Sequence, residues 1–229
     1  MDRSHLPLQT WFWALYMVAR DKRGCSAMQL SKELELPYNT AWFLLHRIRH
    51  AMANRDQDYL LSGIVELDDT YFGGPKKGGK RGRGTRKAKV LVGISKNEEG
   101  KPRYLKMQVI PNLKGKTIGK YAGKMIENGT VVQSDAYHSY RKPLEEKYLH
   151  HFEVFDSNSD MLHWLHIMIG NAKAFVMGTY HGLGEKHLQS YLDEFCYRFN
   201  RRYFQGEIFS RLLCAAASSN AFRLADLTL

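Results

Sequence analysis

Apolar residues recur at helical spacing in the N-terminal part of the chain. Trp11, Leu15 and Val18 follow one helical face, with Phe12 and Tyr16 beside it. The pattern predicts an amphipathic helix here.

Two further helices are expected after this segment, which Gly24 closes. Ser26 can cap the second helix, and Pro37 interrupts it. A third helix is expected from Ala41 to Met52, capped by Asn39 or Thr40. Two helices joined by a tight turn near Pro37 resemble a helix-turn-helix.

The third expected helix carries several basic side chains, namely His46, Arg47, Arg49 and His50. Such a helix suits a recognition helix that meets phosphates, and Arg47 and Arg49 are the candidate DNA contacts. A plain three-helix bundle with a solvated basic face is the alternative, because the helix-turn-helix pattern is weak on its own.

From residue 63 onward the pattern changes to that of strands. It predicts strands at 64–68, 90–94, 103–110, 130–135 and 151–155, and helices at 115–127, 160–177 and 185–203. This order is typical of an α/β fold, and by analogy it matches an RNase H-like fold. We expect a helix-turn-helix domain at 1–58 and an RNase H-like mixed sheet with flanking helices at 59–229.

The segment between the first two predicted strands, residues 73–87, is dense in glycine and positive charge. Glycine lets cations approach a phosphate backbone closely, so DNA contact is favoured over a merely solvated loop. The candidate DNA contacts are Lys80, Arg81, Arg83, Arg86 and Lys87.

The overall charge also favours a polyanionic partner. Lys and Arg number 34 against 23 acidic residues, giving a formal net charge of +11. A merely soluble basic protein is the alternative. The cysteines form no CxxC pair, no apolar run approaches a membrane span, and the first residues have no signal-peptide core. We expect a cytoplasmic, nucleoid-associated protein that does not bind a membrane.

Two aspartates end two separate predicted strands, Asp68 and Asp135. Paired carboxylates at strand ends can hold two divalent ions, Mg²⁺ or Mn²⁺, for phosphoryl transfer. An aspartate at a strand end is otherwise a turn or cap residue.

A third active-site residue should come from the predicted helix at 160–177. His166 and Lys173 are seven positions apart and share one face, whereas Asn171 lies on a different face. Either His166 or Asn171 is otherwise a structural hydrogen-bonding residue.

Ordered motifs along nearly the whole chain resemble the ISXO-like insertion-sequence transposases. They are Val65–Gly74 with the Lys-Arg-Gly-Arg-Gly stretch, Ser134–Tyr137, Gly178–His181, Tyr191–Phe195 and Arg198–Arg202. The resemblance implies an RNase H-like DDE domain that cuts transposon ends and joins them to target DNA. It also implies that Asp68 is the first catalytic carboxylate and Asp135 the second, while Asp69 stands where the family often has Glu.

The chain departs from this family pattern in two places. The third catalytic residue is often Glu with a basic residue seven positions on, and here those places hold His166 and Lys173. Other branches of the family look as if they use Asn as the third catalytic residue, and Asn171 is then the candidate. Because magnesium prefers oxygen ligands, we expect Asn171 to ligate the metal and His166 to contact DNA or a bound water. Many members carry a zinc ribbon ahead of the helix-turn-helix, and because this chain lacks it we expect a truncated copy, an internal-start product or an incomplete gene model.

The expected partner is double-stranded DNA, both transposon ends and target, on which the chain would act as a homo-oligomer. The first rival function is a DNA-binding protein without catalysis, either a repressor-like helix-turn-helix module or an inactive remnant. The second is a structure-specific nuclease of similar fold. Metal-dependent nicking of DNA that contains a transposon end would exclude the first rival. Strand joining would exclude the second as the whole function.

Overall fold

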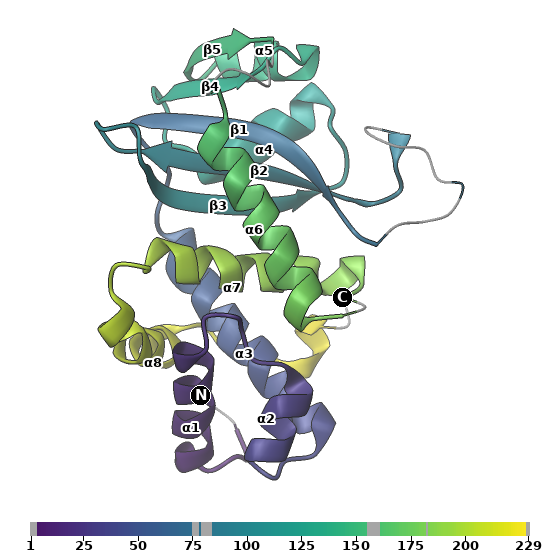
Figure 1. Ribbon diagram of the computed structural model, residues 1–229, viewed down its shortest axis with the longest axis vertical. Coiled ribbons are helices and arrows are strands. Elements are labelled where there is room, and N and C mark those ends of the chain that lie inside the picture. Colours follow the sequence, from purple (N-terminus) through teal and green to yellow (C-terminus); the bar gives the residue numbers. More distant parts are fainter. Residues whose placement is uncertain (1–3, 75–77, 79–83, 155–160, 182, 228–229) are drawn as a thin grey trace. The chain divides into compact units, whose positions relative to one another are not determined.

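The computed structural model describes the chain except for residues 1–3, 75–77, 79–83, 155–160, 182 and 228–229 (Figure 1). It divides into two compact units. The helical unit comprises Met1–Asp58, Phe175–His181 and Asp193–Leu229. The sheet unit comprises Tyr59–Ala174 and Gly182–Leu192.

The helical unit is built from α1 (Leu8–Arg20), α2 (Ala27–Glu33), α3 (Tyr38–Gln57) and α8 (Ile208–Ser218). It also holds the last residues of α6 (His163–Thr179) and most of α7 (Leu188–Asn200). Trp11, Leu15 and Val18 are buried, so the predicted face of the first helix is its core face.

Local sequence signals fix the ends of these helices. The Ser26 hydroxyl accepts a hydrogen bond from the Gln29 amide at 3.1 Å, as its predicted capping role requires. Pro37 immediately precedes α3, which therefore starts earlier than the predicted Ala41. Gly24 has φ +91°, a conformation that favours glycine, and a Cβ there would collide with the Tyr180 hydroxyl.

The helical unit does not end at residue 58, where the sequence suggested a boundary. Tyr197, Leu212 and Ala216 from the C-terminal helices are buried in the same core as Trp11 and Leu44. The physical reason is that α1 and α3 need apolar partners, and α7 and α8 supply them from the far end of the chain.

The sheet unit is built on a five-stranded mixed sheet in the order β3-β2-β1-β4-β5. β1 pairs antiparallel with β2, and β2 antiparallel with β3, whereas β4 is parallel to both β1 and β5. The strands are β1 (Ile64–Phe72), β2 (Ala88–Lys96), β3 (Pro102–Ile110), β4 (Val131–Asp135) and β5 (Leu149–Glu153). This mixed α/β arrangement has the RNase H-like order expected from the sequence.

Helices cover both faces of this sheet (Figure 1). On one face, α4 (Gly115–Met125) and α5 (His138–Glu145) pack on Val65 and Leu67 of β1. On the other face, α6 meets β1 through Glu66 and Asp68. Because side chains alternate along a strand, these two sets of β1 residues must point to opposite faces.

The sequence did not predict α5 or α8. α5 is eight residues long and contains Pro143, which masks its helical pattern. In the described part of the chain, no helix combines the length and apolarity needed to cross a bilayer.

Candidate active site

Asp68 and Asp135 lie side by side on the sheet. Leu67 of β1 pairs with Ser134 of β4 in a parallel register, so the next positions are Asp68 and Asp135. Val65 and Val132 pair in the same ladder and are both buried in the core beneath α4. By strand alternation, both aspartates therefore point away from that core, to the α6 face.

The two aspartates differ in their place along the strand. β4 ends at Asp135, as the sequence predicted, whereas β1 runs past Asp68 to Phe72 beside β2. Asp68 thus marks the end of the parallel pairing with β4. The Asp135 carboxylate accepts the Tyr137 amide at 3.1 Å, and that of Asp68 accepts the Asp69 amide at 2.7 Å.

His166 of α6 faces Asp68. Its Nε2 lies 3.4 Å from Asp68 Oδ2. The hydrogen bond to Asp68 raises the pKa of His166, against a smaller opposing effect of burial. The imidazole therefore holds a proton beside the carboxylate more readily than an isolated histidine does.

The expectation that α6 turns Asn171 toward the two aspartates is not met. Asn171 is exposed, and five residues at 100° each place it roughly 140° around the helix from His166. Leu165, Met168 and Ala172 form the buried side of α6. Packing of this apolar side fixes the helix rotation and brings His166 to Asp68.

Lys173 lies on the same face as His166, as predicted. Its Nζ is 5.9 Å from the centre of the Phe72 ring. Burial lowers the pKa of Lys173, and the nearby charge of Lys87 lowers it further. Lys173 of α6 and Lys87, the residue just before β2, are therefore near enough for their charges to interact.

The basic loop is only partly described. Lys80, Arg81 and Arg83 lie outside the described residues. Arg86 is exposed and Lys87 is half-buried.

Glu66 and Lys96 lie one layer beneath the aspartates, on the same face. Lys96 Nζ is 2.9 Å from Glu66 Oε1 and donates to Gln133 Oε1 at 2.8 Å. Glu66 Oε2 accepts the amide of Leu165 at 3.2 Å. The sequence analysis missed both residues. The available signal was the even spacing of Glu66 and Asp68 along one strand.

Asp69 points to the opposite face of the sheet. Its Oδ1 accepts the hydroxyl of Tyr140, a buried α5 residue, at 2.9 Å. Burial and the neighbouring carboxylate raise the pKa of Tyr140 well above its ordinary value. This separates Asp69 from the candidate metal ligands.

Arg49 is not available for DNA contact. Its side chain is 2% exposed, and its Nε lies 2.7 Å from Glu194 Oε2, also 2% exposed. Arg198 pairs with the other oxygen of Glu194 at 2.7 Å. The predicted DNA contact is therefore corrected to a buried ion pair of the helical unit, placed there by the packing of α3 on α7.

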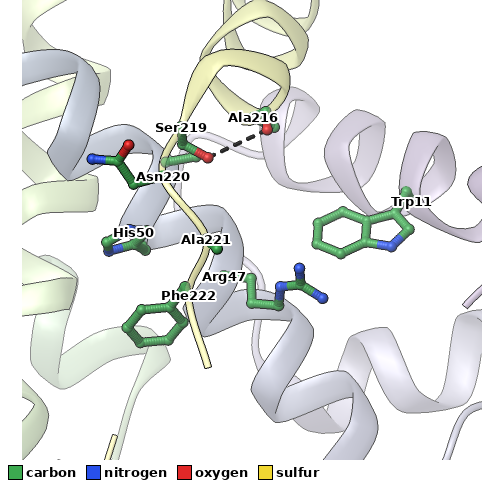
Figure 2. A pocket seen from close by; sticks show the side chains of 9 residues that line it. Trp11, Arg47, His50, Ala216, Ser219, Asn220, Ala221 and Phe222 are labelled. Carbon is green, nitrogen blue, oxygen red and sulfur yellow. Dashed lines mark hydrogen bonds between the residues drawn. The ribbon is translucent and has the colours of Figure 1, made fainter. Parts of the chain in front are cut away.

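Arg47 lies at the edge of a pocket in the helical unit, and Figure 2 shows it between Trp11 and Phe222. Its guanidinium carbon is 4.9 Å from the Trp11 ring centre. The Phe222 ring stacks on His50 with centroids 4.6 Å apart, and the Asn220 amide donates to the Asn54 side chain. The segment after α8 thus lies along the α3 face that carries Arg47.

The donor set of the site suits a hard divalent cation. Two carboxylates on one face supply the oxygen ligands that Mg²⁺ and Mn²⁺ prefer, and Mg²⁺ usually retains several waters. Among the described residues, however, no group of three or more His, Cys, Asp and Glu side chains is arranged to hold a metal. Asp68 and Asp135 are the two aspartates of this face whose oxygens could ligate such an ion.

Comparison with known proteins identifies the family. A family model described as an ISXO2-like transposase domain matches residues 60–200. Among solved structures, the chain is similar to the Mos1 strand transfer complex (TM-score 0.38, 13% identity) and a pre-cleavage Mos1 transpososome (TM-score 0.27, 14% identity). Both alignments cover 97% of this chain and 83% of the other. None of the curated proteins matches it. The matched range contains both aspartates, His166 and Lys173, and the chain belongs to the ISXO2-like transposase family.

Proposed function

We propose that this chain is a DDE-type transposase that cuts insertion-sequence DNA ends and joins them to target DNA. One observation carries the proposal. Asp68 and Asp135 are adjacent on one face of an RNase H-like sheet, with His166 opposite Asp68, in a chain of the transposase family.

The carboxylates of Asp68 and Asp135 would hold the divalent ions, Mg²⁺ or Mn²⁺. When bound, a pair of such ions neutralises charge on the transferring phosphoryl group and lowers the pKa of coordinated water. Asp68 and Asp135 would hold the ions at the end of the parallel β1–β4 pairing, where both side chains point to the α6 face.

His166 takes the third place in this proposal, instead of Asn171. An imidazole nitrogen is a poor ligand for magnesium, so His166 serves as a proton carrier at Nε2 rather than a metal ligand. Its Nε2 lies 3.4 Å from Asp68 Oδ2, so a proton on this nitrogen would be placed to be donated to a phosphate oxygen of the bound DNA strand.

Double-stranded DNA is the proposed partner, and the chain would act on it as a homo-oligomer. Lys173 and Lys87 supply positive charge beside the end of β1, at Phe72, which would attract the phosphate backbone. Arg86 and the basic residues of the loop between β1 and β2 would extend that contact without reading sequence. Arg47 remains a candidate contact, whereas Arg49 does not.

The test is cleavage and strand transfer of a labelled duplex that carries the end of the element, in magnesium. Asp68→Asn and Asp135→Asn should each abolish cleavage while duplex binding persists, because both remove a metal-holding charge.

A matched pair of α6 variants tests the third residue. His166→Ala should lower the cleavage rate by about 100-fold, within the usual range for loss of a proton-transfer group. Asn171→Ala, an exposed change on the same helix, should leave it within two-fold. If Asn171→Ala lost cleavage and His166→Ala did not, Asn171 would again be the third active-site residue, as expected from the oxygen ligands that magnesium prefers.

A DNA-binding remnant without catalysis is the second candidate. It is favoured by the histidine at the third position and by the lack of a three-residue metal group among the described residues. Duplex binding without any magnesium- or manganese-dependent cleavage of the wild-type chain would establish it. Cleavage without joining would instead indicate a nuclease.

A further inference from the structure

The N-terminus of α6 relies on a residue from another element. The first turn of the described helix contains no acidic residue, and Leu162, just before it, is buried with φ +57°. The first four amides of any helix lack intrahelical partners. Glu66 of β1 accepts one of them, the Leu165 amide, at 3.2 Å, and a carboxylate suits the positive end of the helix dipole.

Glu66 is held in place by a buried ion pair. Its side chain is 2% exposed, and Lys96 of β2, 17% exposed, lies 2.9 Å away. A buried charge needs both a counter-charge and hydrogen bonds, and here Lys96 and the Leu165 amide provide them. Lys96 also donates to Gln133 of β4 at 2.8 Å.

The residues that Glu66 and Lys96 contact lie close in sequence to the residues of the candidate active site. Glu66 and Gln133 face each other in the β1–β4 register, and the aspartates stand two residues further along their strands. Leu165 directly precedes His166. The Glu66–Lys96 pair therefore connects all three elements that carry the site, β1, β4 and α6.

We propose that Glu66 and Lys96 are positioning residues that set the distance between His166 and the two aspartates, an inference that rests on the proposed transposase function. The carboxylate fixes the first turn of α6 on β1, and the ammonium ties β1 to β4. Catalytic groups must be held to within a fraction of an ångström, and a displacement of 1 Å can cost about 100-fold in rate.

Two uncharged double variants separate positioning from general stability. Glu66→Gln with Lys96→Met keeps an acceptor for the Leu165 amide, whereas Glu66→Leu with Lys96→Met removes it. Both avoid a stranded buried charge, and apolar replacement of a buried ion pair is often tolerated. Amide hydrogen exchange is measured on the full chain without metal or DNA, alongside kcat and KM for end cleavage.

We expect the Gln variant to keep the first turn of α6 protected. In the Leu variant, exchange at Leu165 and His166 should rise at least ten-fold, and kcat should fall about 100-fold with KM for the duplex unchanged. Cleavage by the Gln variant should be rescued to within about ten-fold of wild type. Lys101→Met, which removes an ion pair whose partners are both 67% exposed, is the control and should change neither measurement.

Equal exchange in the two double variants would overturn the proposal, and so would a rise spread over the whole sheet unit, which indicates a general stabilising role. A wild-type chain that does not cleave would refute the proposed function alone. The exchange of the Leu165 amide would still decide whether Glu66 fixes the helix.

Discussion

Replacing Arg49 by methionine distinguishes two roles for this residue. As a phosphate contact, Arg49 would matter for DNA affinity and little for stability. As the buried partner of Glu194, with both side chains 2% exposed, it should matter for stability. Burial alone would raise the pKa of Glu194, but Arg49 and Arg198 outweigh it and hold the pKa below its ordinary value.

The structure sets the size of the expected effect. Removing one partner of a buried ion pair typically costs about 3–5 kcal/mol, because the other charge stays buried. Arg198 still pairs with Glu194 in Arg49→Met, so we expect about 3 kcal/mol, and a Tm lower by about 6–12 °C. Glu194→Leu strands both arginines and should cost about 5 kcal/mol.

Urea unfolding followed by tryptophan fluorescence measures the change, with duplex binding assayed on the same samples. Arg211→Met is the control, because its pair with Glu207 is 40% and 60% exposed and should contribute less than about 1 kcal/mol. Since the pKa of Glu194 is lowered in the folded chain, its stabilising effect is present at neutral pH and is lost as pH falls through that folded value. Full stability in Arg49→Met together with weaker DNA binding would refute the structural role.

Three further predictions concern the loop, a glycine and the histidine. Alanine at the five loop cations should weaken duplex binding and reduce its log–log salt slope by roughly 0.9 per lost contact, whereas an unchanged slope would indicate a solvated turn. These residues are Lys80, Arg81, Arg83, Arg86 and Lys87. Gly24→Ala should lower Tm more than Gly100→Ala, because both have positive φ but only Gly24 faces a close side chain, the Tyr180 hydroxyl; equal losses would contradict this. The pKa of His166 is raised in the folded chain. With divalent ions removed by a chelator, the contribution of His166 to stability should therefore be full below about pH 6.5 and fade as pH rises through the pKa of the folded chain. Urea unfolding at pH 6 and 8 measures the free energy of unfolding of the wild type and of His166→Gln. The same pH dependence of this free energy in both proteins would argue against the Asp68 contact.

The sequence by itself determined the local structure and the two aspartates. Short apolar runs bounded by turn residues located all five strands, although β5 begins two residues before the predicted 151–155. Ser26 marked the start of α2 through backbone chemistry that needs no distant partner, whereas Gly24 lies in the turn after α1, which ends at Arg20. The motifs around Asp68 and Asp135 indicate the transposase family by sequence alone.

Only the tertiary structure decided what each polar side chain meets. The rotation of α6 is set by which apolar residues it buries, and that rotation brings His166 rather than Asn171 to Asp68. The sequence predicts Arg49 to be a surface cation on α3. In the folded chain it pairs in the core with Glu194, 145 residues away. Glu66 gains its partners from β2 and α6, elements that adjoin it only once the sheet and its covering helix have formed.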